Sequence, residues 1–98
     1  MLGWEKRSAR RVPIDCPASV MLPDGSEHMV MVKDLSVEGL SFESGLDLPE
    51  DMEIELRLLP PAGSLIEPLQ CKVHVVRSAP TDMPFSYLTS ARSLQVEK

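Results

Sequence analysis

Residues 14–33 read IDCPASVMLPDGSEHMVMVK, and this stretch decides the fold class. Apolar residues recur at every second position from Ile14 to Leu22, which is the period of a strand with one buried face. The PDGS segment at 23–26 predicts a tight turn, because its glycine can adopt a positive φ. A second alternating segment follows at 27–33, so the stretch predicts a β-hairpin.

The rest of the chain repeats this pattern. Short strands are predicted at 40–43, 52–58, 71–76 and 85–89, with 94–96 as an extension of the last. Short strands at intervals of about ten residues indicate a small all-β barrel or sandwich. With five or six strands, closure into a barrel removes exposed sheet edges.

Some segments interrupt the alternation. Pro13 and Pro17 lack the N–H that a ladder needs, so the first strand is expected to be bulged or at an edge. Residues 59–68, which contain prolines and a glycine, predict a loop. Residues 90–98 lack caps and a broad apolar stripe, so a C-terminal helix is expected to be short or absent.

Length and composition limit the possible classes of protein. The 98 residues suffice for one domain, and the hydrophobic fraction of 43% is typical of a globular protein. No apolar run approaches the length of a membrane span, and the first residues lack the apolar stretch of a signal peptide. We therefore expect a cytoplasmic protein that does not insert into a membrane.

Basic charge is concentrated at the N-terminus. The formal net charge is −5, yet Lys6, Arg7, Arg10 and Arg11 stand there against Glu5 alone. A nucleic-acid-binding protein usually spreads its cations over a larger face, and the chain also lacks the aromatic rows that stack on single strands. A compact anionic ligand held by a short basic arm fits this distribution better than a nucleic-acid polymer does.

The remaining chemistry-bearing residues form no recognisable catalytic or metal site. Cys16 and Cys71 are far apart without ligand spacing and are expected to be buried, and no metal site is predicted. His28 and His74 belong to no catalytic motif, so we do not expect an enzyme. We expect core or sheet packing for at least one of three methionines, with a partner surface as the alternative: Met21, Met29 and Met31.

The basic arm contains Arg7-Ser8-Ala9-Arg10-Arg11, which has the pattern RxxxR. An arginine fork can donate two hydrogen bonds to guanine O6 and N7, or hold a phosphate with two hydrogen bonds. By spacing alone the pattern is more typical of a solvated run of charge.

A second motif, DxSxxG, runs from Asp34 to Gly39. An ionised aspartate only accepts hydrogen bonds, which matches the N1–H and N2–H donors of guanine and not adenine. Ser36 can support that contact, and Gly39 permits a positive φ or a close approach to a ligand. The alternative is a structural turn in which Asp34 and Ser36 bond to nearby backbone amides.

The two motifs, in this order and before and within a predicted β-barrel, resemble the signature of the PilZ domain family. The resemblance implies a mostly antiparallel six-stranded barrel and a site for cyclic dimeric GMP (c-di-GMP). It assigns ligand binding to the motif positions Arg7, Arg11, Asp34, Ser36 and Gly39. The neighbouring cations are weaker, auxiliary candidates: Lys6 and Arg10.

The resemblance covers roughly residues 7–77 and implies one PilZ-like domain over 1–98, with a flexible basic arm at 1–12 and the barrel at 13–98. We expect a receptor that couples c-di-GMP to a downstream protein partner in bacterial signalling, for example in motility or biofilm formation. The alternative within the family is a ligand-independent interaction module of the kind that serves pilus or flagellar assembly.

Overall fold

The computed structural model describes residues 12–65 and 68–93. The basic arm with Lys6, Arg7, Arg10 and Arg11 lies outside them, as do 94–98, where the extension of the last strand and the short or absent helix were expected. Within the described residues the chain forms strands, turns and loops and contains no helix, so none that could cross a membrane.

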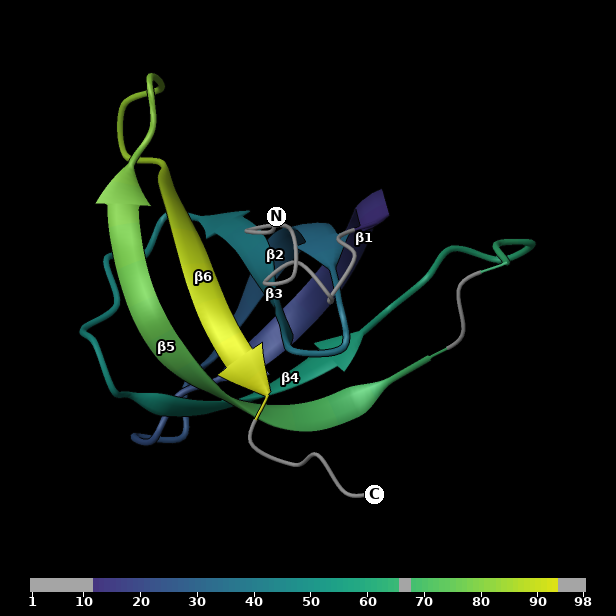
Figure 1. The fold of residues 1–98 in the computed structure, drawn as a ribbon, viewed down its shortest axis with the longest axis horizontal. Helices are drawn as coiled ribbons and strands as arrows, with labels where there is room; N and C mark the ends of the chain where they lie inside the picture. The colour runs from purple at the N-terminus through teal and green to yellow at the C-terminus, as the bar shows by residue number, and fades with distance from the viewer. Residues whose placement is uncertain (1–11, 66–67, 94–98) are drawn as a thin grey trace, which may run out of the picture.

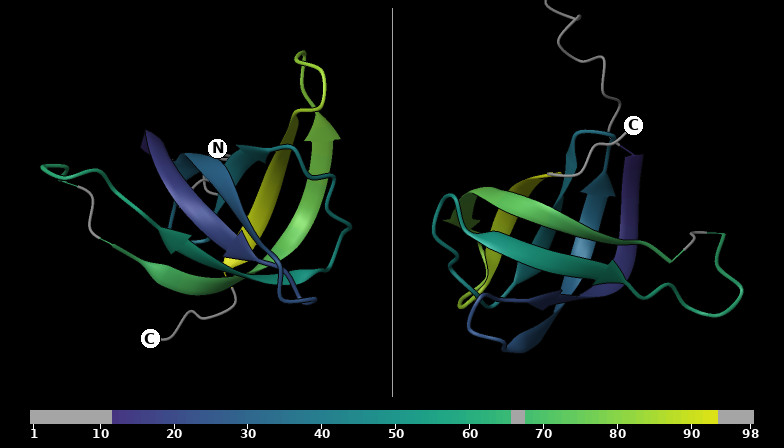
Figure 2. Two further views of the ribbon diagram at one scale, coloured as in Figure 1. Left: turned by 180° about the vertical axis from the view of Figure 1, so that it is seen from behind. Right: turned by 90° about the horizontal axis from the view of Figure 1, so that it is seen from below.

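Six strands close into an antiparallel barrel (Figure 1). In chain order they are β1 (Val12–Met21), β2 (Glu27–Leu35), β3 (Gly39–Ser44), β4 (Glu53–Leu58), β5 (Gln70–Pro80) and β6 (Tyr87–Ser93). Around the barrel the order is β1-β2-β3-β6-β5-β4, so β6 lies between β3 and β5. The views in Figure 2 show this closed arrangement from behind and from below. The six-stranded barrel confirms the predicted fold class.

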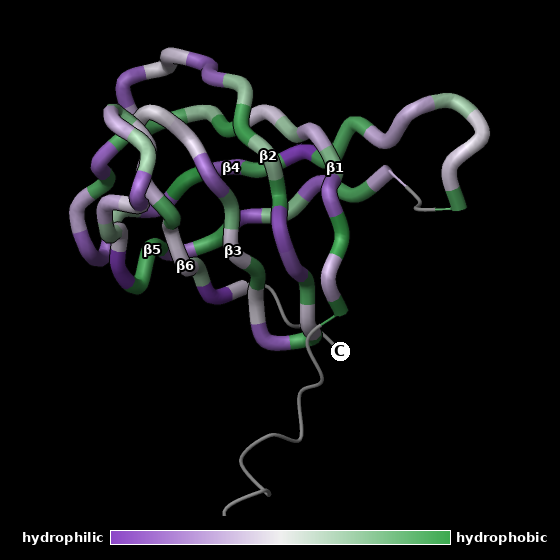
Figure 3. The backbone as a smooth tube through the Cα atoms, turned by 90° about the horizontal axis from the view of Figure 1, so that it is seen from above, coloured by the Kyte–Doolittle hydropathy of each residue, from purple (hydrophilic) through white to green (hydrophobic). Residues whose placement is uncertain are grey.

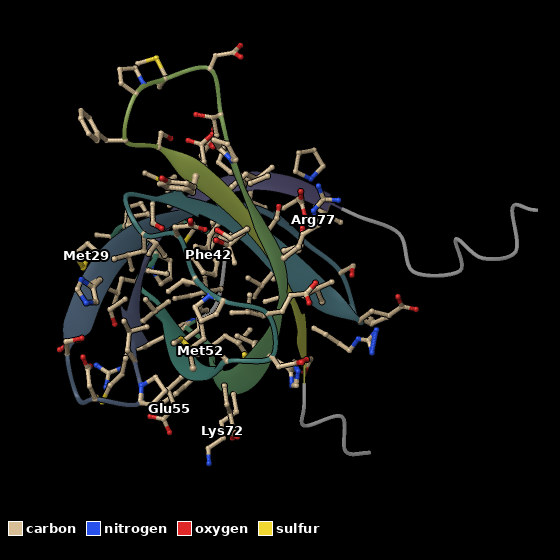
Figure 4. The ribbon with its side chains drawn as sticks, turned by 90° about the vertical axis from the view of Figure 1, so that its left-hand side faces the viewer. Met29, Phe42, Met52, Glu55, Lys72 and Arg77 are labelled. Atoms are coloured by element: carbon tan, nitrogen blue, oxygen red, sulfur yellow. The ribbon has the colours of Figure 1, made fainter. Side chains whose placement is uncertain are left out.

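The alternation of residue types along the strands builds the core. Figure 3 shows hydrophobic and hydrophilic positions following one another along the strands. In Figure 4, Phe42 lies in the middle of the barrel, whereas Met29 and Lys72 lie at its periphery. Every strand contributes buried residues, and the last strand contributes Thr89 at 0% exposure and Ala91 at 5%.

The predicted turns and loops connect these strands. Gly25 adopts a φ of 89° in the turn between β1 and β2. The Ser26 hydroxyl and amide both donate to the Asp24 carboxylate, which holds the pKa of that group below its usual value. The described parts of the β4–β5 connection, 59–65 and 68–69, extend away from the barrel in Figure 1, as expected for the proline-containing loop.

Two expectations about burial need correction or refinement. All three methionines are exposed, at 42% for Met21, 62% for Met29 and 38% for Met31, so none of them packs in the core, and any packing they make is on the outer face of the sheet. On β2 the narrower, β-branched Val30 and Val32 face the core instead. Cys16 is buried as predicted, whereas Cys71 is only partly buried against the core.

Candidate functional site

The side chain of Asp34 faces outward because β2 contains a bulge. Strict alternation from buried Val32 would turn Asp34 into the barrel. The register of β2 and β3 shifts between these two residues, so that Val32 lies opposite Phe42 and Asp34 lies opposite Ser41. Bulges commonly re-aim side chains near binding sites. The bulge presents the Asp34 carboxylate on the outer face of the barrel.

A hydrogen bond from β3 orients this carboxylate. The Ser41 hydroxyl donates to Asp34 Oδ2 over 2.7 Å. Ser41 is only 4% exposed, although it lies on the outer face between inward-facing Leu40 and Phe42. A short bond from a buried hydroxyl to a charged acceptor restricts the rotation of the carboxylate. The Oδ2 atom of Asp34 is therefore held in one direction by Ser41.

Ser36 closes the turn that joins β2 to β3. Its amide donates to the Gly39 carbonyl over 2.8 Å, and the Gly39 amide returns a bond over 3.3 Å. The Ser36 hydroxyl also donates to that carbonyl and accepts from the amide of Glu38. The structural role that the sequence left open for Ser36 is therefore present in the molecule. Asp34 itself still belongs to β2, so the turn begins two residues later than the motif.

A glycine is needed at position 39 because β3 and β6 lie in close contact there. Its φ is not positive; among the glycines of residues 12–65 and 68–93, only Gly25 and Gly63 adopt positive values. A Cβ placed on Gly39 would lie 2.1 Å from the carbonyl oxygen of Ala91 and 2.9 Å from the Cα of Arg92. The backbone of Gly39 therefore lies in close contact with the backbone of β6, whereas its close approach to a ligand stays a prediction.

The first strand enters the barrel beside this motif. Val12 lies opposite Leu35, and Pro13 lies opposite Asp34. The register of β1 and β2 then shifts before Cys16, which confirms the bulge expected from the prolines. The segment that carries the arginines is thus bonded directly to residues that pair with the DxSxxG motif.

The cation nearest to Asp34 along the chain already has a partner. Lys33 Nζ lies 2.7 Å from Asp15 Oδ1, and this hydrogen bond raises the pKa of the lysine above its ordinary value. Both side chains are substantially exposed, at 38% and 71%. Lys33 is therefore neutralised by β1 and is a poor candidate for holding an anion.

Other features of the described residues lie away from the motif. One surface hollow of about 310 Å³ is lined by β1, β4 and β5 residues such as Met21 and Lys72. A second, of about 450 Å³, includes Met29, Met31 and Phe85. No group of three or more histidine, cysteine or acidic side chains in this part of the chain is arranged to hold a metal ion.

The sequence did not identify two residues that the fold brings to the motif. Ser41 binds Asp34, and Arg92 lies opposite Gly39 across β3 and β6. A signal for Ser41 was present, because it follows Gly39 by two positions and so shares its face of the strand. Nothing in the local sequence marks Arg92, since its position depends on pairing between distant strands.

Comparison with known structures finds the same fold in several bacterial proteins. The Bacillus subtilis inhibitor of motility, MotI/DgrA, matches with a TM-score of 0.75 and 12% identity over 93% of this chain and 44% of its own. The PilZ domain of YcgR from Escherichia coli with c-di-GMP matches with a TM-score of 0.68 and 16% identity, covering 94% of this chain and 80% of its own. The K. pneumonia MrkH–c-di-GMP complex matches with a TM-score of 0.70 and 13% identity over 89% and 43%. This chain thus spans less than half of the MotI/DgrA and MrkH chains.

A search of curated proteins gave no significant match. The family comparison is decisive, since the model of the PilZ domain matches residues 5–92, nearly the whole chain. That range includes both motifs and all six strands up to the penultimate residue of β6. This match shows that the chain, with its bulged β2 and its DxSxxG hairpin, belongs to the PilZ domain family.

Proposed function

We propose that this PilZ domain is a receptor for c-di-GMP, with Arg7, Arg11, Asp34, Ser36 and Gly39 forming its site. The observation that carries the proposal is the β1–β2 register. Pro13 lies opposite Asp34, so the segment with the arginines joins the barrel beside the outward-facing carboxylate. The Cα atoms of bonded residues are about 3.8 Å apart, which keeps Arg11 close to Val12 and within reach of a ligand at Asp34.

The chemistry of the two motifs suits this ligand. Asp34 faces outward with Ser41 holding one oxygen, an arrangement that can accept the N1–H and N2–H donors of a guanine. Arginine forks can hold the phosphates or the O6 and N7 edge of guanine. A cyclic dinucleotide offers two guanines and two phosphates in one compact molecule. The YcgR and MrkH structures that share this fold contain c-di-GMP, which supports the same ligand here.

Ligand binding would bring the basic arm against the barrel, and we propose that this change alters a surface for a downstream protein. Ordering of a segment by a ligand is a common switching device. Lys6 and Arg10 are auxiliary cations in this scheme, close enough in sequence to add phosphate contacts.

Isothermal titration with c-di-GMP tests the proposal, with GTP and cyclic dimeric AMP as controls. We expect saturable binding of c-di-GMP alone. Arg7→Ala and Arg11→Ala should each weaken binding by about 1–3 kcal/mol if each makes a bidentate contact. Arg57→Ala is the matched control, because this exposed arginine lies on β4, three strands from β3 in either direction around the barrel. Absence of binding by the parent protein would refute the receptor role.

The role of Asp34 has its own test. Asp34→Ala should chiefly reduce the preference for c-di-GMP over cyclic dimeric AMP, because the paired acceptor for N1–H and N2–H is lost. Competition titrations of both ligands measure that ratio. A variant that discriminates as strongly as the parent would show that another group reads the base.

The second candidate is a ligand-independent protein-interaction module. The observation in its favour is the exposure of large apolar side chains, 62% for Met29 and 90% for Phe85. Exposed apolar patches often mark interaction sites. The c-di-GMP titration separates the two functions, since the module would show no heat and no binding at high ligand concentration.

A further inference from the structure

Two arginines outside both motifs share the outer face of the barrel with Asp34. On β6, Thr89 and Ala91 are buried, so Ser90 and Arg92 point outward. On β5 the register shifts between Val75 and Arg77, which places Arg77 opposite Ser90. Without this bulge, strict alternation from buried Val75 would turn Arg77 into the core. Arg77 instead lies outside the barrel, away from the central Phe42, in Figure 4.

The strand registers align these arginines with the DxSxxG motif. One row of paired residues crosses four strands in the order Asp34, Ser41, Ser90 and Arg77. Two residues further along β3 and β6, on the same outer face, Arg92 lies directly opposite Gly39. Adjacent strands are about 4.8 Å apart. The backbone of Arg92 is therefore one strand spacing from Gly39, and the backbone of Arg77 is two spacings, about 10 Å, from that of Ser41.

Neither arginine is neutralised within 12–65 and 68–93. The ion pairs there use Lys33, Lys72 and His74 as their basic partners. Arg77 and Arg92 are both exposed, and the residues between Arg77 and Asp34 in the first row are uncharged serines. An acidic chain, with a net charge of −5, thus keeps two free guanidinium groups beside its proposed ligand site.

We propose that Arg92 and Arg77 bind phosphate oxygens of the ligand that Asp34 contacts, which extends the site from the β2–β3 hairpin across β6 to β5. This inference rests on the proposed function. The two strand arginines would then hold the dinucleotide from the β5 side of Asp34. Arg92, which is nearer to the motif, makes the larger contribution.

Titration with c-di-GMP of three single variants tests this arrangement. Arg92→Gln should weaken binding roughly tenfold and Arg77→Gln roughly threefold, as expected for loss of charge-assisted hydrogen bonds in partly exposed positions. Arg57→Gln removes an exposed, unpaired arginine from β4, the strand opposite β3 in the barrel, and should leave affinity unchanged. Raising the salt concentration should weaken binding less steeply in Arg92→Gln than in the parent.

Arg92→Lys is a second variant, which keeps the positive charge that Arg92→Gln removes. Because a lysine holds phosphate as a point charge, it should recover most of the affinity lost in Arg92→Gln. Thermal unfolding of each variant confirms that the barrel is intact. If the parent binds and all glutamine variants bind equally well, the strand arginines make no contact and the receptor role stands. If the parent itself does not bind, the receptor role fails and this inference fails with it.

Discussion

At the scale of single residues, the site depends on how one carboxylate is held. Asp34 is an acceptor whose usefulness for base recognition lies in the direction of its two oxygens. The Ser41 hydroxyl fixes one of them over 2.7 Å, and Ser41 is too well buried for water to replace it readily. The orientation of the DxSxxG aspartate, on which the proposed base recognition rests, therefore involves a serine that the motif does not include.

Replacing Ser41 should expose this dependence. Ser41→Ala removes the donor and leaves Asp34 Oδ2 without it, so c-di-GMP should bind roughly three- to tenfold more weakly. The preference over cyclic dimeric AMP should also decrease, because the carboxylate loses its fixed orientation. Competition titrations measure both quantities.

Ser41→Thr is the control, since it keeps a hydroxyl on the same carbon and should retain parent affinity. Equal binding by Ser41→Ala and Ser41→Thr would show that Asp34 is oriented without this bond.

At the scale of elements, the hairpin of β2 and β3 is held against β6. The turn is closed by bonds between Ser36 and Gly39, and the amide of Ser93 donates to the Glu38 carbonyl over 2.9 Å. Gly39 allows the backbones of β3 and β6 to approach at this point. The motif hairpin is thus supported by the last strand of the barrel, independently of any ligand.

Gly39→Ala should destabilise the fold. The new methyl group would lie 2.1 Å from a backbone carbonyl oxygen, so the two strands must separate. Overpacking of this kind costs about 1–3 kcal/mol of unfolding free energy. Urea unfolding measures the change.

Gly45→Ala is the matched control for this prediction. Its φ is not positive, and its Cβ would meet only the Phe85 carbonyl oxygen at 3.5 Å, an ordinary contact. If Gly39→Ala unfolds at the same urea concentration as Gly45→Ala, the contact between β3 and β6 relaxes without cost.

The sequence predicted the elements better than it predicted the faces of the strands. The alternation at 52–58 and the turn at 23–26 are local signals, and both were confirmed. Both faces of β2 carry apolar residues, so the alternation alone left open whether the methionines or the valines face the core, and three-dimensional packing selects the valines. The pairing of Ser41 with Asp34 depends on the register shift between β2 and β3, and the position of Arg92 opposite Gly39 depends on the pairing of β3 with β6. The spacing of Ser41 from Gly39 was a local signal, whereas no local pattern marks Arg92.

At the scale of the whole molecule, the barrel encloses one core to which all six strands contribute. A domain of this size is expected to unfold as a single cooperative unit. Ionisation at any partly buried position therefore acts on the stability of the entire domain. Cys71, which packs against this core from β5, is such a position, since burial raises the pKa of its thiol.

The pH dependence of stability should report this thiol. In the unfolded chain Cys71 ionises at its ordinary pKa, whereas the folded protein retains the proton to higher pH. Above the ordinary pKa the unfolded state binds fewer protons, so the free energy of unfolding falls as pH rises. Urea unfolding of the parent and of Cys71→Ala from pH 7 to pH 10 should therefore show a steeper alkaline decline in the parent. Parallel curves would show that the thiol titrates equally in both states.

The bulge in β2 has a consequence for how such chains are recognised from sequence. Val32 and Asp34 are separated by an even number of positions, yet one faces the core and the other faces solvent. A regular ladder that kept Lys33 would preserve both motifs letter for letter, yet it would turn the aspartate towards the core. A related chain with perfect motifs can thus present its carboxylate to the wrong side. The presence or absence of a bulge between the last buried valine and the aspartate is as informative as the motif itself.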